Sequence, residues 1–292
     1  MKKVAIVGAG LVGSSAAYAL MIDGSADEIA LVDVCKEKAK GHAMDLSHGS
    51  EFVPSVKISA CDDYSVCKDA QIVVICAGVA RKPHESRLDL IHKNAVILKN
   101  VITKIKEVNT DCILVLVANP VDVLTYLAIK ESGFPVNKVF GTGTMLDTAR
   151  FKFLLSEHFN VEPAAVDALV LGEHGTTAFP YLSAARIDDK PITEDVSGVF
   201  EQVKKVSAEV IAKKGATHYA IGLCVSKLVR ILLSDKEEVL PVSTLVGDVC
   251  LSVPCIINKD GIKEQVKIKL NDSEKESMEK SASALKEVIS QL

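Results

Sequence analysis

The stretch VAIVGAGLVG, residues 4–13, decides the fold of this 292-residue chain. A short apolar run, Val4–Val7, leads directly into a G-x-G-x-x-G motif that opens a stretch of small residues suited to a helix. In this strand–turn–helix setting, Gly8 permits the tight turn, Gly10 lets the backbone approach a pyrophosphate, and Gly13 lets the helix pack on the sheet. The helix N-terminus favours the anion. We therefore predict a dinucleotide-binding turn rather than a plain glycine-rich turn.

An acidic residue ends the second apolar run, twenty positions after Gly13. Asp33 at this place can accept hydrogen bonds from both ribose hydroxyls of NAD, and it would repel the 2′-phosphate of NADP. The alternative is an Asp that only makes a turn at a strand end. Its distance from the glycine motif favours the ribose role, so we predict NAD as the cofactor.

Short apolar runs alternate with amphipathic stretches along the first half of the chain. Val, Ile and Leu dominate most of these runs without polar alternation, which is typical of parallel strands covered on both faces. The expected strands are Val4–Val7, Ile29–Val32, Val56–Ser59, Ile72–Cys76, Ile113–Val117 and Lys138–Phe140. The expected helices are Val12–Asp23, Lys36–Gly49, Leu88–Asn109 and Val121–Ser132. This alternation predicts an α/β doubly wound parallel sheet of the Rossmann type.

The pattern changes after Gly141. The expected elements are a helix at Thr148–Phe159, a strand at Val166–Leu171, an interrupted helical region at Glu194–Leu233, antiparallel strands at Leu240–Val246, Val249–Ile257 and Gln265–Leu270, and a final helix with Ser273 and Glu276 at capping-box spacing. We predict an NAD-binding domain over residues 1–141 and an α+β catalytic domain that binds the substrate over residues 142–292.

Composition and charge exclude several classes of function. Lys and Arg total 34 against 38 Asp and Glu, and this balance argues against a nucleic-acid partner. The longest apolar runs, 72–80 and 112–118, are far too short to span a membrane, and the N-terminus lacks a secretory pattern. The eight cysteines include no C-x-x-C pair, so we expect reduced thiols, no metal site and a cytoplasmic protein.

Three residues of the second half form a candidate proton-transfer site. His174 follows an apolar run within Gly172-Glu173-His174-Gly175, and a loop imidazole there can act as a general acid and base. Asp147 could orient it, and Arg150, one helical turn further on, could bind a substrate carboxylate. The alternatives are a surface histidine and a helix-capping aspartate, because spacing alone does not prove that the three side chains meet.

A charged loop, RKPHESR at residues 81–87, follows the strand at Ile72–Cys76. Ligands of open α/β sheets bind at the carboxyl ends of strands, so this loop could be a lid that carries Arg81 and Arg87 to an anionic substrate. The alternative is a solvated loop.

These residues together resemble the NAD-dependent L-lactate/L-malate dehydrogenase family. The resemblance runs in order along essentially the whole chain. It is carried by GAGLVG at 8–13, Asp33, RKPHESRLDL at 81–90, ANPVD at 118–122, GTGTMLDTARF at 141–151, GEHG at 172–175 and KGATHYAIG at 214–222.

The resemblance implies a role for each matching residue. His174 would give its proton to the substrate keto oxygen, Asp147 would stabilise the imidazolium, and Arg87 would polarise the carbonyl. The implied substrate-binding residues are Arg81, Arg87, Asn119, Arg150 and Thr217. The implied cofactor-binding residues are Gly8, Gly10, Val12, Gly13, Asp33, Lys38, Tyr64, Gly78, Val79, Val117, Asn119 and Thr142. Similar proteins are usually homotetramers or homodimers, and an oligomer is expected here.

The substrate depends on one lid residue. Malate-specific members of the family carry Arg at the position of Arg81, and lactate-specific members usually carry Gln. The stretch Glu85–Leu90 and Thr217 instead resemble the lactate enzymes. We expect a dehydrogenase of short L-2-hydroxy acids that favours malate and oxaloacetate, with lactate and pyruvate as the alternative. A non-catalytic NAD-binding protein is the alternative of another class, and the presence of the implied catalytic residues argues against it.

Overall fold

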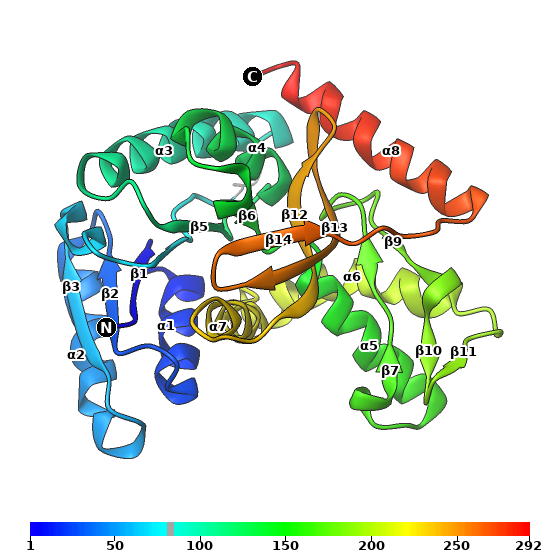
Figure 1. Ribbon diagram of the computed structural model, residues 1–292, viewed down its shortest axis with the longest axis horizontal. Helices are drawn as coiled ribbons and strands as arrows, with labels where there is room; N and C mark the ends of the chain where they lie inside the picture. Colours follow the sequence, from blue (N-terminus) through cyan, green and yellow to red (C-terminus); the bar gives the residue numbers. More distant parts are fainter. Residues whose placement is uncertain (81–84) are drawn as a thin grey trace.

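A single nine-stranded sheet forms the centre of the protein. The computed structural model describes residues 1–80 and 85–292, and of Arg87 it describes only the backbone, so the predicted role of Arg81 lies outside the described residues. The strand order is β14-β13-β12-β6-β5-β4-β1-β2-β3. Figure 1 shows helices packed on both faces of this sheet.

Six parallel strands form one side of the sheet, as the sequence predicts. They are β1 (Lys3–Val7), β2 (Glu28–Val32), β3 (Lys57–Cys61), β4 (Ile72–Ile75), β5 (Ile113–Leu116) and β6 (Val139–Gly141). Successive side chains of β1 enter different cores: Val4 and Ile6 lie in one cluster, and Ala5 and Val7 lie in the other. Both faces are therefore buried, which explains why these strands lack polar alternation.

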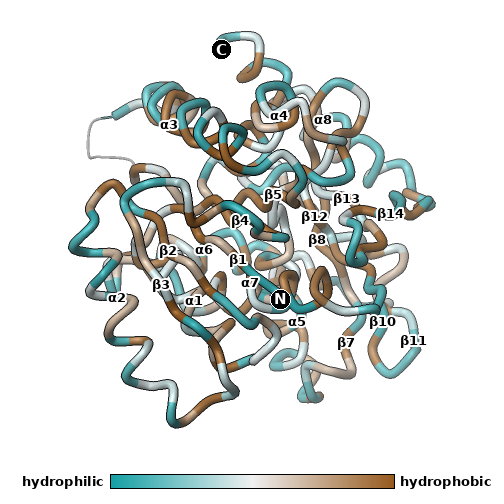
Figure 2. The backbone as a smooth tube through the Cα atoms, turned by 60° about the vertical axis from the view of Figure 1, so that its left-hand side comes forward, coloured by the Kyte–Doolittle hydropathy of each residue, from teal (hydrophilic) through white to brown (hydrophobic). Residues whose placement is uncertain are grey.

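Two layers of helices cover the sheet. The helices of the first half are α1 (Leu11–Asp23), α2 (Lys36–His48), α3 (Arg87–Val108) and α4 (Val121–Ser132). Helices α1 and α2 contribute to one core together with α7 (Tyr219–Leu232), and α3 and α4 contribute to the other with α8 (Asp272–Ile289). Figure 2 shows hydrophobic and hydrophilic residues alternating along α3, whose buried side includes Leu98 and Ile102. Among the residues that the structure describes, no helix is both long and apolar enough to cross a membrane.

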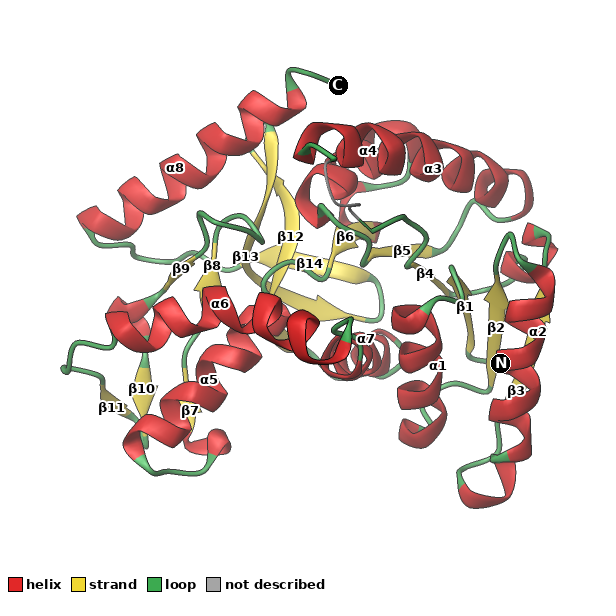
Figure 3. Ribbon diagram, turned by 180° about the vertical axis from the view of Figure 1, so that it is seen from behind, coloured by secondary structure: helices red, strands yellow, loops and turns green. Residues whose placement is uncertain are grey.

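The second half adds α5 (Met145–Phe159) and α6 (Ser197–Lys214), which pack around a third core that contains Phe151 and Phe200. Figure 3 shows α6 running past α5 toward α7. The strands of this half are β7 (Val166–Asp167), β8 (Val170–Leu171), β9 (Phe179–Pro180), β10 (Arg186–Ile187), β11 (Lys190–Pro191), β12 (Glu238–Val246), β13 (Val249–Asn258) and β14 (Gly261–Gln265).

The structure corrects three details of the sequence analysis. The predicted strand Val166–Leu171 is two short strands in different sheets, because β7 pairs with β10 whereas β8 pairs with β9. The third antiparallel strand starts at Gly261 and ends at Gln265, where the sequence analysis expected it to begin. The capping box of α8 joins Asn271 and Glu274 rather than Ser273 and Glu276.

The three antiparallel strands extend the parallel sheet. Strand β12 pairs with β6 through Ser243 and Gly141. A Cβ atom at Gly141 would lie 2.5 Å from the Thr125 hydroxyl oxygen, so the glycine allows α4 and β12 to approach β6 closely. One sheet thus runs through both halves of the chain. The predicted division between residues 141 and 142 stays a prediction.

Candidate active site

His174 lies on the loop between β8 and β9. The loop turns at Gly172, whose φ of +89° is strained for any residue with a Cβ atom, and a Cβ there would also lie 2.5 Å from the Ser281 hydroxyl oxygen. The backbone of Gly172 exchanges hydrogen bonds with Ser252 of β13 at 3.0 and 2.9 Å. The turn and the pairing fix where the loop begins.

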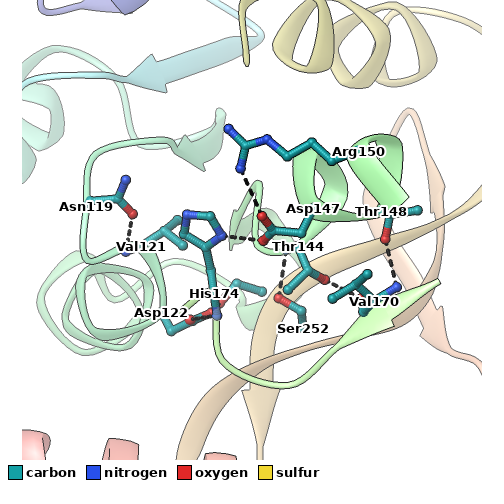
Figure 4. A network of polar contacts seen from close by, with 11 residues as sticks. Asn119, Val121, Asp122, Thr144, Asp147, Thr148, Arg150, Val170, His174 and Ser252 are labelled. Atoms are coloured by element: carbon teal, nitrogen blue, oxygen red, sulfur yellow. Dashed lines mark hydrogen bonds and ion pairs between the residues drawn. The ribbon is translucent and has the colours of Figure 1, made fainter. Parts of the chain in front are cut away.

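Helix α5 brings two polar side chains to the same place (Figure 4). The Nδ1 atom of His174 lies 2.6 Å from Oδ2 of Asp147, and Nη1 of Arg150 donates to Oδ1 of Asp147 at 3.1 Å. Thr148 accepts a hydrogen bond from the Val170 amide at 2.9 Å and so ties this part of α5 to β8. The structure therefore brings together the three residues whose meeting the sequence left open.

The charges around His174 favour its protonated form. Burial opposes protonation of the imidazole, but attraction to Asp147, assisted by Asp122, outweighs it and raises the pKa of His174 above its ordinary value. Burial likewise works against the ionised Asp147, and the positive charge of His174 and Arg150 reverses that effect and lowers the pKa of Asp147. The pair therefore favours an imidazolium beside a carboxylate, which suits a proton donor.

A second carboxylate, to which the sequence analysis gave no role, binds the backbone of the histidine. Asp122 is only 2 % exposed, and its Oδ2 atom accepts a hydrogen bond from the His174 amide at 2.7 Å. Its Oδ1 atom accepts from the Ser243 hydroxyl at 2.6 Å. Burial raises the pKa of Asp122 to about 6. The sequence signal for Asp122 was the ANPVD stretch at 118–122, of which it is the last residue.

Three adjoining pockets form one cleft past these side chains. The first, of about 360 Å³, contains Asp147, Arg150 and His174, and the second, of about 100 Å³, shares Arg150 and His174 with it. The third, of about 270 Å³, shares Val12, Val117 and Asn119 with the second. The cleft therefore leads from the glycine-rich turn to the histidine.

Half of the residues predicted to bind cofactor or substrate line this cleft. Thr142 and Thr217 line the second pocket, and Gly78 and Val79 line the third. Ser207 of α6, which the sequence analysis missed, lines both the first and the second pocket. It lies in an amphipathic helix with no local motif, so the sequence offered no signal for it.

The glycine-rich turn has the shape that a pyrophosphate requires. Gly8 has a φ of +99°, and a Cβ atom at Gly13 would lie 1.9 Å from the carbonyl oxygen of Gly8. A Cβ at Gly10 would meet no atom, so this backbone faces open space. The carboxylate of Asp33 accepts hydrogen bonds from the amides of Ala9 and Cys35 at 2.8 and 2.9 Å and is thereby held at the turn. These residues fit a dinucleotide that runs along the cleft.

Gly8, Gly10, Gly13, Asp33, Lys38 and Tyr64 line none of the three pockets as the described residues form them, and Arg87 is described only in part. Lys38 is exposed on α2, and Tyr64 lies half-buried in the short helix Tyr64–Cys67 beneath the Lys104 ammonium group. The backbone of Arg87 starts α3, where Ser86 and Asp89 form a capping box.

Asn94 of α3 is another residue that the sequence analysis missed. Its Oδ1 atom accepts from the Val79 amide at 2.8 Å, and its Nδ2 atom donates to the Asn119 carbonyl at 2.7 Å. It is 2 % exposed, so these bonds are shielded from water. Asn94 therefore holds the two loops that form the cofactor end of the cleft.

A dinucleotide turn and a carboxylate-paired histidine on one cleft define the class of this protein, a nicotinamide-dependent oxidoreductase. The chain belongs to the lactate/malate dehydrogenase family: the NAD binding domain of that family matches residues 2–141, and its alpha/beta C-terminal domain matches residues 144–292. The family resemblance, the fold class and NAD as cofactor are thereby confirmed. The protein is an NAD-dependent oxidoreductase that acts on a CH–OH group.

Similar proteins are known from several bacteria. The chain is 44 % identical to the L-lactate dehydrogenase of Acetivibrio thermocellus over 100 % of its own length and 98 % of that protein. It is 43 % identical to the L-lactate dehydrogenase of a Geobacillus species over 99 % and 96 %. A solved lactate dehydrogenase from a Medee basin deep-sea metagenome library superimposes with a TM-score of 0.96 at 38 % identity and covers 99 % of this chain and 98 % of that one.

Proposed function

We propose that this enzyme interconverts pyruvate and L-lactate with NAD. The observation that carries the proposal is the His174–Asp147 pair beside Arg150 in one pocket, at distances of 2.6 and 3.1 Å. The choice of lactate is supported by the relatives, which are named L-lactate dehydrogenases. It departs from the preference for malate expected from the sequence, which rested on Arg81 alone.

The reaction needs a hydride and a proton. When bound, the nicotinamide supplies the hydride to the carbonyl carbon. Because Nδ1 of His174 is engaged by Asp147, Nε2 is the atom that gives its proton to the carbonyl oxygen. In lactate oxidation the same atom takes the hydroxyl proton, and Asp147 stabilises the resulting imidazolium. The raised pKa of His174 favours the protonated form of this donor.

The substrate is held by its carboxylate. Arg150, whose side chain is only 13 % exposed, can form a forked pair of hydrogen bonds with it and still contact Asp147. Asn119 and Thr217 border the second pocket beside Arg150 and His174, and we propose that they enclose the rest of the substrate. Arg87 is proposed to polarise the carbonyl, on the family resemblance alone.

The cofactor is proposed to run along the cleft from the glycine-rich turn to His174. Its proposed contacts are Gly8, Gly10, Val12, Gly13, Asp33, Lys38, Tyr64, Gly78, Val79, Val117, Asn119 and Thr142. On this proposal residues 1–141 bind NAD and residues 142–292 supply the proton donor and the carboxylate site.

One assay tests the choice of substrate. The oxidation of NADH is measured with pyruvate and, separately, with oxaloacetate, and we expect a higher kcat/KM with pyruvate. Oxaloacetate is the second candidate, because the guanidinium of Arg81 would pair with its second carboxylate and would be left unpaired beside the methyl group of pyruvate. A higher kcat/KM with oxaloacetate that Arg81→Gln reverses would establish the malate enzyme. If the enzyme turned over neither acid, both the lactate and the malate proposal would be contradicted, and the protein would bind NAD without this activity.

We also propose that the enzyme is a homotetramer or homodimer of the cytoplasm. Helices α1 and α7 expose large apolar side chains that line a pocket of about 400 Å³: Tyr18, Ile22, Tyr219 and Leu223. Exposed patches of this kind commonly mark protein interfaces. All eight cysteines are free thiols, in keeping with a reducing compartment. Sedimentation of the wild type and of Leu223→Glu tests the assembly, and a wild-type monomer at micromolar concentration would contradict it.

A further inference from the structure

We propose that Asp122 is a positioning residue for proton transfer at His174. It fixes the backbone of the proton donor against the cofactor half of the cleft, and its negative charge favours the protonated imidazole. The inference rests on the proposed role of His174 and assigns a function to a carboxylate that lines none of the three pockets of the cleft.

Asp122 forms hydrogen bonds with two segments that are far apart in the sequence. It lies in the first turn of α4, three residues after Asn119, which borders the second pocket. Its two oxygen atoms bond the His174 amide on one side and the Ser243 hydroxyl of β12 on the other, at 2.7 and 2.6 Å. The distance between the Asn119 side of the cleft and the His174 loop therefore depends on this carboxylate.

The charge of Asp122 acts in a dry environment. Among the described residues, the charged groups that act on the His174 imidazole are Asp147 and Arg150 of α5 and Asp122 of α4. Those near Asp122 are His174 and the buried Glu173 of the same loop, and the buried Cys250 thiol of β13 lies close to it. Attraction between Asp122 and the imidazolium is weakly screened because Asp122 is buried and the His174 side chain is only 25 % exposed. Asp122 thus favours the charged form of His174 without contacting its ring.

The substitution Asp122→Asn removes the negative charge of the side chain and keeps its shape. The amide can still accept from the His174 backbone, and the Ser243 hydroxyl can rotate to accept from the new NH₂ group. Losing the negative charge lowers the pKa of His174. Pyruvate reduction, which needs the protonated imidazole, should then decline at a lower pH than in the wild type. We expect roughly ten-fold slower reduction on the alkaline side of the profile.

Lactate oxidation should respond in the opposite way, because it needs the neutral imidazole. Its rate in Asp122→Asn should rise at a lower pH than in the wild type. A variant that is merely damaged would lose activity in both directions at every pH. A parallel displacement of both profiles toward acid is therefore specific to an electrostatic role. Equal profile midpoints in the variant and the wild type would overturn the proposal.

Two measurements are independent of turnover. An NMR titration of the His174 ring in cofactor-free enzyme, with the signal assigned by its loss in His174→Gln, should show a lower pKa in Asp122→Asn. The Tm of Asp122→Asn at pH 7 should be no lower than that of the wild type, because ionised Asp122 is costly to bury.

Asp122→Ala, which also loses the hydrogen bonds to His174 and Ser243, should lower kcat by about 100-fold with little change in NADH affinity.

Glu274→Gln is the matched control. Glu274 is also a buried carboxylate near a helix N-terminus, and it bonds the amide and hydroxyl of Ser183 at 2.9 and 2.7 Å. It lines none of the three pockets of the cleft. Its substitution should leave both pH profiles unchanged, and an equal displacement there would also overturn the proposal. Failure of the proposed function would show separately, as wild-type enzyme that turns over neither acid.

Discussion

Replacing Asp147 by Asn should slow pyruvate reduction strongly while leaving the fold intact. The carboxylate now accepts from two donors, the His174 ring at 2.6 Å and the Arg150 guanidinium at 3.1 Å. An amide of the same shape has one accepting oxygen and one donating NH₂ group. Whichever way the amide turns, its NH₂ group faces one of the two donors.

The size of the effect follows from the loss of one charge-assisted hydrogen bond. Such a bond contributes about 1.5–3 kcal/mol, which corresponds to about 10- to 150-fold in rate when the bond supports the proton donor. Solvent screening takes away little, because the side chains of Asp147 and His174 are only 12 % and 25 % exposed.

Steady-state kinetics with NADH and pyruvate would measure this loss, with NADH affinity from fluorescence as the check on folding. The matched control is Asp195→Asn, an exposed carboxylate that caps the backbone of Ser197. We expect wild-type kcat from the control. If Asp147→Asn keeps more than half of the wild-type kcat, the carboxylate does not support the proton donor and the assignment fails.

Three further predictions concern the cofactor and stability. NADH should be preferred to NADPH by roughly ten-fold or more, because the 2′-phosphate would face Asp33; equal kcat/KM values would remove Asp33 from its role. Gly13→Ala should lower the Tm and abolish NADH binding, since its Cβ would lie 1.9 Å from the Gly8 carbonyl oxygen, and unchanged binding by calorimetry would refute this. The lowered pKa of Asp147 means that its stabilising contribution is present above the carboxyl's ordinary pKa and is lost as pH falls through the lowered value; the Tm of Asp147→Asn should therefore fall less steeply in acid than that of the wild type.

The parallel half of the fold was predictable because its signals are local. The run Val4–Val7 is apolar on both faces, and the glycines at 8 and 13 each meet a steric need of the turn that follows it. Helix α4 lies at Val121–Ser132 as predicted. The addition of β12 to the edge of β6 was not predictable, since it depends on contacts between residues about a hundred positions apart.

The candidate site shows the same limit. His174, Asp147 and Arg150 attracted attention because each side chain has chemistry of its own. Asp122 and Asn94 act on backbone groups distant in sequence, His174 and Val79, so no spacing or residue type reveals their partners. The antiparallel strand misplaced at Gln265–Leu270 has a different cause, because it starts directly at the turn of Gly261, whose signal is local in the sequence.

The sheet is continuous across β6 and β12, and this continuity fixes the distance between the two ends of the cleft. Asp33 stands at the end of β2, and the His174 loop is tied through Gly172 to β13, so both ends of the cleft belong to one framework. A framework of this kind holds the two ends of the cleft at one separation, so it favours ligands of matching length. Two short fragments, one at each end, should bind without influencing each other. A single ligand that joins them should bind more tightly, because its linker already matches the distance between the two ends.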